Sequence, residues 1–270
     1  MSRAGRWLGG HLVLILGLVV LVYMFVPVAV IVLMSFNDQA SKNSYTFDGF
    51  TLDNWGSICE PYQLCDSVRT SIEIGVLATL GATLLGTLMA FAMVRHRFRG
   101  RSAANLFVFL PMATPEIVMG SSLLALFVNG GAAGLLGFWT ILVSHILFCL
   151  SFVVVTVKAR LSGLDPRLEE AAADLYANEW QTFWRVSFPL VFPGILAAAL
   201  LSFSLSFDDF IITNLNSGQE QTFPMFVWGA AQKGIPPEIN VIGTIMFVVA
   251  LTAVLVGEVG GRRRAGKMAS

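Results

Sequence analysis

The residues most suited to binding chemistry are acidic side chains inside long apolar runs. Asp208 and Asp209 are adjacent in the run "PGILAAALLSFSLSFDDFIITN", and Glu116 follows Pro115 in another. If these runs cross a membrane, an Asp costs about 2.5–3.5 kcal/mol at the helix centre, and two neighbouring carboxylates also repel each other. We therefore expect such acids to meet a cation or to face a water-filled cavity.

Residue spacing around the acid pair predicts a path for an organic cation. On a helix, one side carries Ser202, Ser206, Asp209 and Thr213, and the neighbouring side carries Phe203, Phe207 and Phe210. A carboxylate face beside an aromatic face suits a flexible organic cation, through ion pairing and cation–π contact. The alternative is structural: the acids bind a neighbouring helix or reach the surface, and the Phe residues pack or face lipid. The candidate substrate-path residues are Asp208, Asp209, Glu116, Ser206 and Phe207.

No pattern for covalent or metal chemistry accompanies these acids. The chain has no GxSxG, P-loop or HExxH sequence, and its three histidines are scattered: His11, His96 and His145. Because a nucleophile–base pair and metal-ligand spacing are both missing, we expect neither an enzyme nor a cofactor or metal bound by this chain. Arg69 and Glu73 are four residues apart and are expected to pair with each other.

The three cysteines fall into two groups. Cys149 lies inside an apolar run and is expected to be a small core residue. Cys59 and Cys65 are six residues apart in a more polar segment. For these two, a disulfide and a pair of free thiols are both open alternatives.

The composition predicts a membrane protein with several helices. The 270 residues are 56% apolar and 13% charged, whereas soluble domains carry about 25% charged residues. Runs of about 20 apolar residues are long enough to cross the ~30 Å hydrocarbon core of a bilayer. We expect an all-α fold with six transmembrane helices, at about 12–34, 67–94, 104–129, 138–157, 190–213 and 240–259. The first run is too long for a signal peptide and has no A-x-A site after it, so it is expected to be a retained helix.

The distribution of Lys and Arg predicts the orientation of these helices. Fourteen of the 17 basic residues lie in segments 1–11, 95–103, 158–189 and 260–270, whereas segments 35–66 and 214–239 carry only Lys42 and Lys233. Because positively charged loops stay in the cytoplasm, both termini are expected there, as tails 1–11 and 260–270 on a transmembrane domain over 12–259. The arginines of 95–101 are expected to meet anionic membrane lipid.

The cytoplasmic segment 158–189 has helix-start signals at two places. Asp165 and Pro166 form a favoured start, and the carboxylates that follow suit the positive helix end, so a helix is predicted over about 166–176. Asn178 can cap a second helix, with Gln181 in capping-box position. The sequence therefore predicts two short helices between the fourth and fifth spans.

These two helices have the surface of a docking element. The first offers a small, smooth face made of Ala171, Ala172 and Leu175, and the second an apolar face made of Trp180, Phe183 and Trp184. The alternative is an amphipathic helix lying among the lipid headgroups. Spacing alone leaves both interpretations open.

Segment 170–189 resembles the EAA loop of ABC-importer permeases, in which E-A-A is followed by three residues, Gly, nine residues and I-x-L-P. Glu170-Ala171-Ala172 and the segment 186–189 match, whereas Tyr176 stands at the Gly position. A bulky residue at positive φ is costly, so we expect Asn178 to make the turn instead. The resemblance implies docking into a cytoplasmic ATPase subunit, with the coupling residues Glu169, Glu170, Ala171, Ala172, Asp174, Leu175 and Tyr176.

The resemblance covers about residues 15–255. The blocks "RHRFRGR", "FVFLPMATPEIVMGSSLLALF" and "LSFSLSFDDFIITNLNSG" are similar to those of spermidine/putrescine permease subunits of the PotC type. This implies the type I importer permease fold, with 158–189 as coupling loop, in a bacterial plasma (inner) membrane. The implied partners are a second permease, two cytoplasmic ATPases that use ATP and Mg, and an extracytoplasmic polyamine-binding protein, but no nucleic acid.

Two other functions stay open. An ABC importer for another solute, such as ferric iron or a different organic cation, would share the same loop. An ion-gradient-driven cation transporter would use Asp208 and Asp209 as its ion site and would need neither this loop nor an ATPase.

Overall fold

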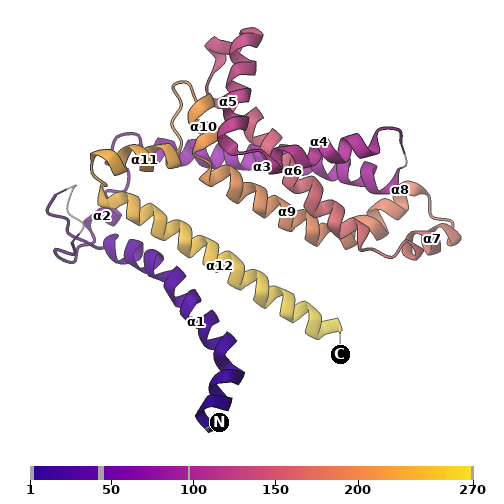
Figure 1. Cartoon of the computed structure of the whole chain (residues 1–270), viewed down its shortest axis with the longest axis horizontal. Helices are drawn as coiled ribbons and strands as arrows, with labels where there is room; N and C mark the ends of the chain where they lie inside the picture. Colours follow the sequence, from indigo (N-terminus) through magenta and orange to yellow (C-terminus); the bar gives the residue numbers. More distant parts are fainter. Residues whose placement is uncertain (1–2, 42–45, 97, 269–270) are drawn as a thin grey trace. The chain divides into compact units, whose positions relative to one another are not determined.

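The computed structural model describes residues 3–41, 46–96 and 98–268, and in this part the chain is built from helices (Figure 1). It forms two compact units, one from residues 1–65 and 227–270 and the other from residues 66–226. Within the described residues, six helices are long and apolar enough to cross a membrane: His11–Met34, Leu64–Arg95, Glu116–Leu135, Phe138–Ser162, Glu179–Asp208 and Pro237–Gly257. The predicted all-α class and number of spans are therefore confirmed.

The first unit pairs the first and last long helices of the chain. Helix α1 (Arg3–Met34) packs against α12 (Pro237–Met268), with the rings of Phe25 and Phe247 6.3 Å apart edge to face. Helix α12 starts before the predicted span and continues through most of the predicted tail 260–270. Residues 269–270, together with Lys42 and Arg97 from the charge count, lie outside the described residues.

The loop after α1 is fastened by side chains. The Asn37 amide donates to the Thr46 carbonyl at 2.8 Å and accepts from the Asp48 N–H at 2.8 Å. After the short helix α2 (Asp53–Gly56), Cys59 and Cys65 form a disulfide, with Cα atoms 5.3 Å apart. The bridge decides between the two alternatives that spacing left open.

The second unit has a core of three long helices: α3 (Leu64–Arg95), α6 (Phe138–Ser162) and α9 (Phe188–Asp208). Helix α6 is the most buried of the candidate spans. Its Val153, Val154 and Val157 are fully buried, and so is Cys149, as expected for a small core residue. Arg69 and Glu73 on α3 form the expected pair, with Nε and Oε1 2.7 Å apart.

The predicted third span, 104–129, is broken into two helices. Helix α4 (Arg101–Ala113) ends at Thr114, whose ψ of 132° is extended, and α5 (Glu116–Phe127) starts after Pro115. Pro115 has no N–H, and its ring disfavours helical geometry at the residue before it. Two short helical turns follow α5, η1 (Val128–Ala132) and η2 (Ala133–Leu135), with Gly131 at φ 83°.

The predicted fifth span, 190–213, begins and ends elsewhere. The preceding loop helix, α8 (Glu179–Thr182), runs through a wide turn, η3 (Phe183–Ser187), directly into α9. This π-type turn lies just before Pro189, which lacks a backbone donor. At the far end α9 stops at Asp208, and a separate helix, α10 (Ile211–Asn216), precedes α11 (Phe223–Lys233).

The contact between α3 and α6 leaves no room for a side chain at Gly86. A Cβ atom there would lie 2.6 Å from Val153 Cγ1 and 2.8 Å from Val153 Cβ. Gly86→Ala should lower the unfolding temperature of the purified protein, because overpacking by one methyl costs about 1–3 kcal/mol, more than the helix propensity gained. Gly17→Ala is the matched control, since a Cβ there has nothing within 4 Å. Equal melting temperatures for both variants would contradict this packing.

Candidate functional site

The break between α9 and α10 is organised by the carboxylate of Asp209. This residue leaves the helix with ψ 124°, and its side chain caps α10. Its Oδ2 accepts the Thr213 N–H at 2.8 Å and the Thr213 hydroxyl at 2.9 Å, and its Oδ1 accepts the Ile212 N–H at 3.4 Å. The carboxylate thus satisfies amides that a helix start would otherwise leave unpaired.

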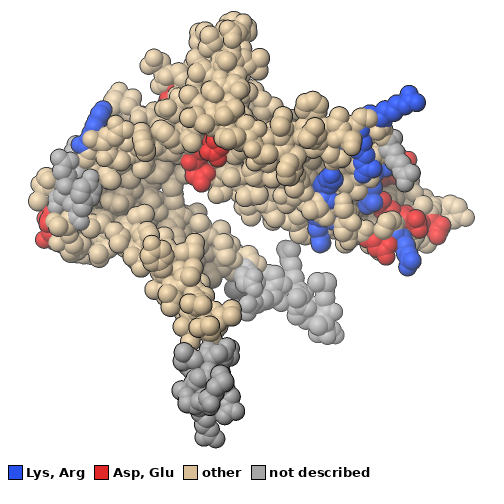
Figure 2. Space-filling view, viewed as in Figure 1, with Lys and Arg blue, Asp and Glu red and all other residues tan. Residues whose placement is uncertain are grey.

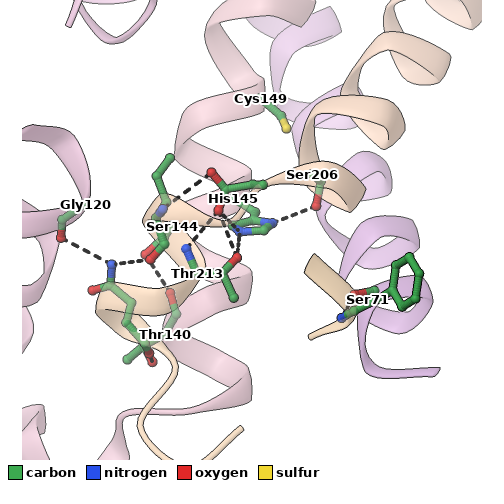
Figure 3. A network of polar contacts seen from close by, with 12 residues as sticks. Ser71, Gly120, Thr140, Ser144, His145, Cys149, Ser206 and Thr213 are labelled. Atoms are coloured by element: carbon green, nitrogen blue, oxygen red, sulfur yellow. Dashed lines mark hydrogen bonds and ion pairs between the residues drawn. The ribbon is translucent and has the colours of Figure 1, made fainter. Parts of the chain in front are cut away.

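His145 on α6 reaches this carboxylate from the neighbouring helix. Figure 3 shows His145 with Ser206 and Thr213. Its Nε2 lies 3.3 Å from Asp209 Oδ2 and 2.9 Å from Thr213 Oγ1, and its Nδ1 lies 2.7 Å from Ser206 Oγ. The side chains of His145 and Asp209 are only 1% and 2% exposed. Three helices therefore meet at one imidazole ring.

The Thr213 hydroxyl proton determines the hydrogen-bond directions in this cluster. The Thr213 hydroxyl donates to Asp209, so it can only accept from His145 Nε2. In the neutral imidazole the other ring nitrogen, Nδ1, then accepts the Ser206 hydroxyl. Each member thus has a donor matched to an acceptor, as a buried polar cluster requires.

The polar contacts continue to one further helix, α5. The Thr140 hydroxyl donates to the Asn216 carbonyl at 2.7 Å, joining the start of α6 to the end of α10. The Asn216 amide donates to the Gly120 carbonyl of α5 at 3.2 Å. At Gly120 an added Cβ would lie 3.2 Å from the Ile212 Cα, so α5 and α10 are in close contact. The cluster ties α5, α6, α9 and α10 together.

The structure separates the two adjacent acids. Asp209 is buried in the cluster, whereas Asp208, the last residue of α9, is exposed. Ser202, Ser206 and Thr213, predicted with Asp209 to line a path, are buried, and two of them bind His145. That side of the helix therefore faces α6.

The other predicted path residues are more accessible. Glu116 is exposed in the first turn of α5, one turn before Gly120. Gly120 packs on Ile212, and Ile212 follows Asp208 by four residues. Asp208 and Glu116 therefore both lie near the α5–α10 contact. Phe207 is partly buried, stacked on Phe203 at 5.8 Å and tilted against Phe223 at 6.3 Å.

His145 was not among the predicted site residues. The sequence carries one usable signal, a histidine within an apolar run that is long enough to span a membrane. Ionisable residues inside such segments normally have a partner. The partner could not be identified from spacing, because His145 and Asp209 lie on different helices.

The predicted coupling loop contains the two expected helix starts. Asp165 Oδ1 accepts the Arg167 N–H at 3.0 Å at the start of α7 (Arg167–Asp174). Asn178 and Gln181 form the predicted capping box at α8, with bonds of 2.8 and 3.1 Å. Acidic and basic side chains gather at the end of the second unit that carries α7 and α8 (Figure 2).

The turn after α7 is made by Tyr176, so the expectation that Asn178 would make it is wrong. Tyr176 has φ 59°, whereas Asn178 has φ −74°. The Ala177 N–H bonds to the Ala172 carbonyl at 3.0 Å and the Tyr176 N–H to the Ala173 carbonyl at 2.9 Å. This is a Schellman motif, which requires the left-handed conformation at the position that Tyr176 occupies.

The predicted docking face also needs one correction. Ala172 is buried at 9% exposure and faces the protein, whereas Ala171 and Glu170 are exposed. Leu175 is 81% exposed and Tyr176 is 97% exposed. The accessible face of the loop is therefore less alanine-rich and more bulky than the spacing predicted.

Glu169 ties the loop to two long helices. Its Oε1 accepts from Arg95 Nη2 at 2.7 Å, at the end of α3, and from the Ser187 hydroxyl at 2.5 Å, just before α9. On the other side of the loop, Phe183 packs edge-on against Phe91 of α3 at 5.2 Å. Helix α7 is thus bonded to the end of α3 and to the turn before α9, the helix whose far end carries part of the polar cluster.

Sequence comparison matches residues 82–260 to a family described as binding-protein-dependent transport system inner membrane component. The chain belongs to this family. It is therefore a membrane-embedded transport component, not an enzyme. Membership also confirms that the chain belongs to a multi-pass protein of an inner membrane that works with a solute-binding protein.

Curated relatives of this permease include polyamine permeases. It is 36% identical over 241 residues to the spermidine/putrescine transport system permease protein PotC of Escherichia coli K12, covering 89% of this chain and 90% of PotC. The Haemophilus influenzae PotC is 35% identical, over 91% and 94% of the two chains. The putrescine transport system permease protein PotI of E. coli K12 is 34% identical, over 83% and 82%.

Solved structures similar to the permease confirm its fold. A bacterial ABC transporter that imports the acidic polysaccharide alginate aligns over 97% of this chain and 98% of its own, with a TM-score of 0.65 at 20% identity. The alginate transporter in complex with its pentasaccharide-bound periplasmic protein gives a TM-score of 0.70 at 18% identity and the same coverage. The permease thus has an ABC-importer permease fold.

Replacing His145 should destabilise the second unit. His145→Ala removes a hydrogen-bond partner of buried polar side chains, and a buried polar group left without its partner costs about 1–3 kcal/mol. We expect a clearly lower unfolding temperature for the purified permease. The control is Cys149→Ala, one turn away on the same helix, which loses only a 3.4 Å contact to the Ser202 carbonyl. A His145→Ala protein that melts with the wild type would show that the cluster contributes nothing to stability.

Charge reversal should test the Arg95–Glu169 pair. Either Arg95→Glu or Glu169→Arg alone places like charges together and should increase hydrogen–deuterium exchange in the peptide 165–178. The double variant restores the ion pair but not the Ser187 bond, so we expect partial recovery, with a coupling energy of about 0.5–3 kcal/mol. If the exchange of the double variant equals the sum of the changes in the two single variants, Arg95 and Glu169 are not directly coupled.

Proposed function

We propose that this permease is one of two membrane subunits of an ATP-driven polyamine importer. The observation that carries the proposal is the sequence similarity to PotC and PotI. The aligned region covers more than 80% of this chain and of each relative. Both names describe polyamine transport, for spermidine and putrescine in one case and putrescine in the other. The proposal extends this cargo class to the present chain.

The exposed acids have the chemistry that a polyamine needs. Asp208 and Glu116 are accessible carboxylates near the α5–α10 contact. A polyamine carries several ammonium groups along a flexible chain, and ammonium–carboxylate hydrogen bonds are about twice as strong as neutral ones. We assign Asp208 and Glu116 to direct contact with the cargo, with Phe207 beside them. Asp209 and Ser206 then lie behind the residues that contact the cargo and stabilise their positions through their bonds to His145.

The coupling loop supplies the contact to the energy source. We propose that α7 docks on a cytoplasmic ATPase through its exposed residues, with Glu169 holding the helix from the inside. Movement of α7 would then reach α3 and α9 through Arg95 and Ser187. This chain binds no nucleotide itself, and ATP and Mg belong to the ATPase.

The proposed assembly places both termini in the cytoplasm. Its support is the charge distribution, with 14 of 17 basic residues in segments assigned to that side. The complete importer would contain this permease, a second permease, two ATPases and an extracytoplasmic polyamine-binding protein.

Uptake by the reconstituted complex tests this function. Proteoliposomes would carry the complex purified with this chain, with ATP inside and the binding protein outside, and would be supplied with radiolabelled spermidine or putrescine. Wild-type vesicles should accumulate a polyamine only when ATP is present. Asp208→Asn should reduce uptake roughly tenfold or more, because a hydrogen bond to a charged group contributes about 1.5–3 kcal/mol.

The control is Glu220→Gln, which neutralises an exposed acid elsewhere in the second unit and should leave uptake unchanged. Uptake without ATP would indicate a gradient-driven transporter instead. ATP hydrolysis that is stimulated by the binding protein, but without polyamine uptake, would support an ATP-driven importer and exclude polyamines as its cargo. Unchanged uptake by Asp208→Asn would remove Asp208 from the path.

A further inference from the structure

The tip of the coupling loop exposes two large side chains, and one of them, Tyr176, has a costly backbone conformation. Tyr176 has φ 59° and a 97% exposed side chain, and Leu175 beside it is 81% exposed. The left-handed conformation is unfavourable for a residue that carries a Cβ atom. An exposed tyrosine ring recovers none of that cost within this chain. Such backbone strain is concentrated at sites where function requires it.

The surroundings of the tip are acidic. Four exposed carboxylates lie within eleven residues of Tyr176 in the sequence, against two exposed bases, Arg167 and Arg185; the carboxylates are Asp165, Glu170, Asp174 and Glu179. Glu169 is excluded from this count because Arg95 neutralises it. An acidic rim around an apolar tip is poorly suited to anionic lipid headgroups, which attract basic residues. The charge of this surface suits a protein partner with a basic rim.

We propose that Tyr176 and Leu175 form an aromatic–aliphatic anchor that selects the partner ATPase, by entering an apolar pocket rimmed with Lys or Arg. This inference rests on the proposed docking of α7 and specifies which residues give that docking its selectivity. The Schellman motif fixes the turn, so the ring projects from a preformed loop and loses little freedom on binding. Tyrosine is among the residues that most often dominate interface energies. The acidic rim adds orientation and rate through charge complementarity.

The anchor makes a prediction that separates strain from binding. In Tyr176→Gly the turn keeps its geometry and loses its strain, so the unfolding temperature of the permease should be unchanged or higher. Its affinity for the ATPase should nevertheless fall about thirtyfold, the effect of losing an interface residue that contributes about 2 kcal/mol. Tyr176→Asn, which also tolerates the left-handed turn, should lose affinity equally. Tyr176→Phe keeps the ring and should bind as the wild type does.

The measurement is the Kd of the purified ATPase for the permease pair in nanodiscs, after the endogenous ATPase has been stripped, at low and high salt. Glu170→Lys is measured in parallel because it reverses charge on the docking face without touching the anchor. If Glu170→Lys weakens binding and Tyr176→Gly does not, the docking surface stands and the anchor is wrong. If neither variant weakens binding, the proposed docking of α7 fails as well. If the Kd is the same at low and high salt, the proposed basic rim of the ATPase pocket is wrong.

Discussion

The second unit depends on the rule that buried backbone amides must find partners where a helix breaks inside an apolar environment. The carboxylate of Asp209 meets this demand between α9 and α10, by accepting the Ile212 and Thr213 amides. A buried carboxylate itself needs neutralisation or hydrogen bonds, and His145 supplies the contact from α6. The histidine thereby sets how α6 meets the break, and through Thr140, Asn216 and Gly120 the same constraint extends to α5.

The break also gives the two neighbouring acids different roles. In a continuous helix the side chains of Asp208 and Asp209 would point in directions about 100° apart around the helix axis. The extended conformation at Asp209 instead leaves Asp208 at the helix end, where it is exposed, and turns Asp209 into the cluster. One acid is thus exposed, while the other accepts the amides at the start of α10. At the opposite end of α3 and α9, Glu169 performs a similar anchoring task for α7.

Sequence patterns predicted what depends on nearby residues and missed what depends on distant ones. The caps at Asp165 and Asn178, the Arg69–Glu73 pair and the number of spans follow from local spacing and hydropathy, and the structure confirms them. The partner of His145 and the inward direction of Ala172 depend on how separate helices pack, which no short window contains. Tyr176 shows a third case: its propensity argued against a left-handed turn, but the two hydrogen bonds of the Schellman motif prevail over an unfavourable residue.

The fold does not determine the charge of the cargo. The structural relatives with TM-scores of 0.65 and 0.70 import an acidic polysaccharide, whereas the sequence relatives PotC and PotI carry polyamines, which are cations. Proteins with this helical scaffold therefore serve cargoes of opposite charge, so the scaffold alone does not select between them. In this permease the exposed side chains near the α5–α10 contact include the carboxylates of Asp208 and Glu116, whose sign would repel a polyanion. The hydrogen bonds at the break, by contrast, involve no cargo, because Asp209, Thr213 and His145 bond to one another.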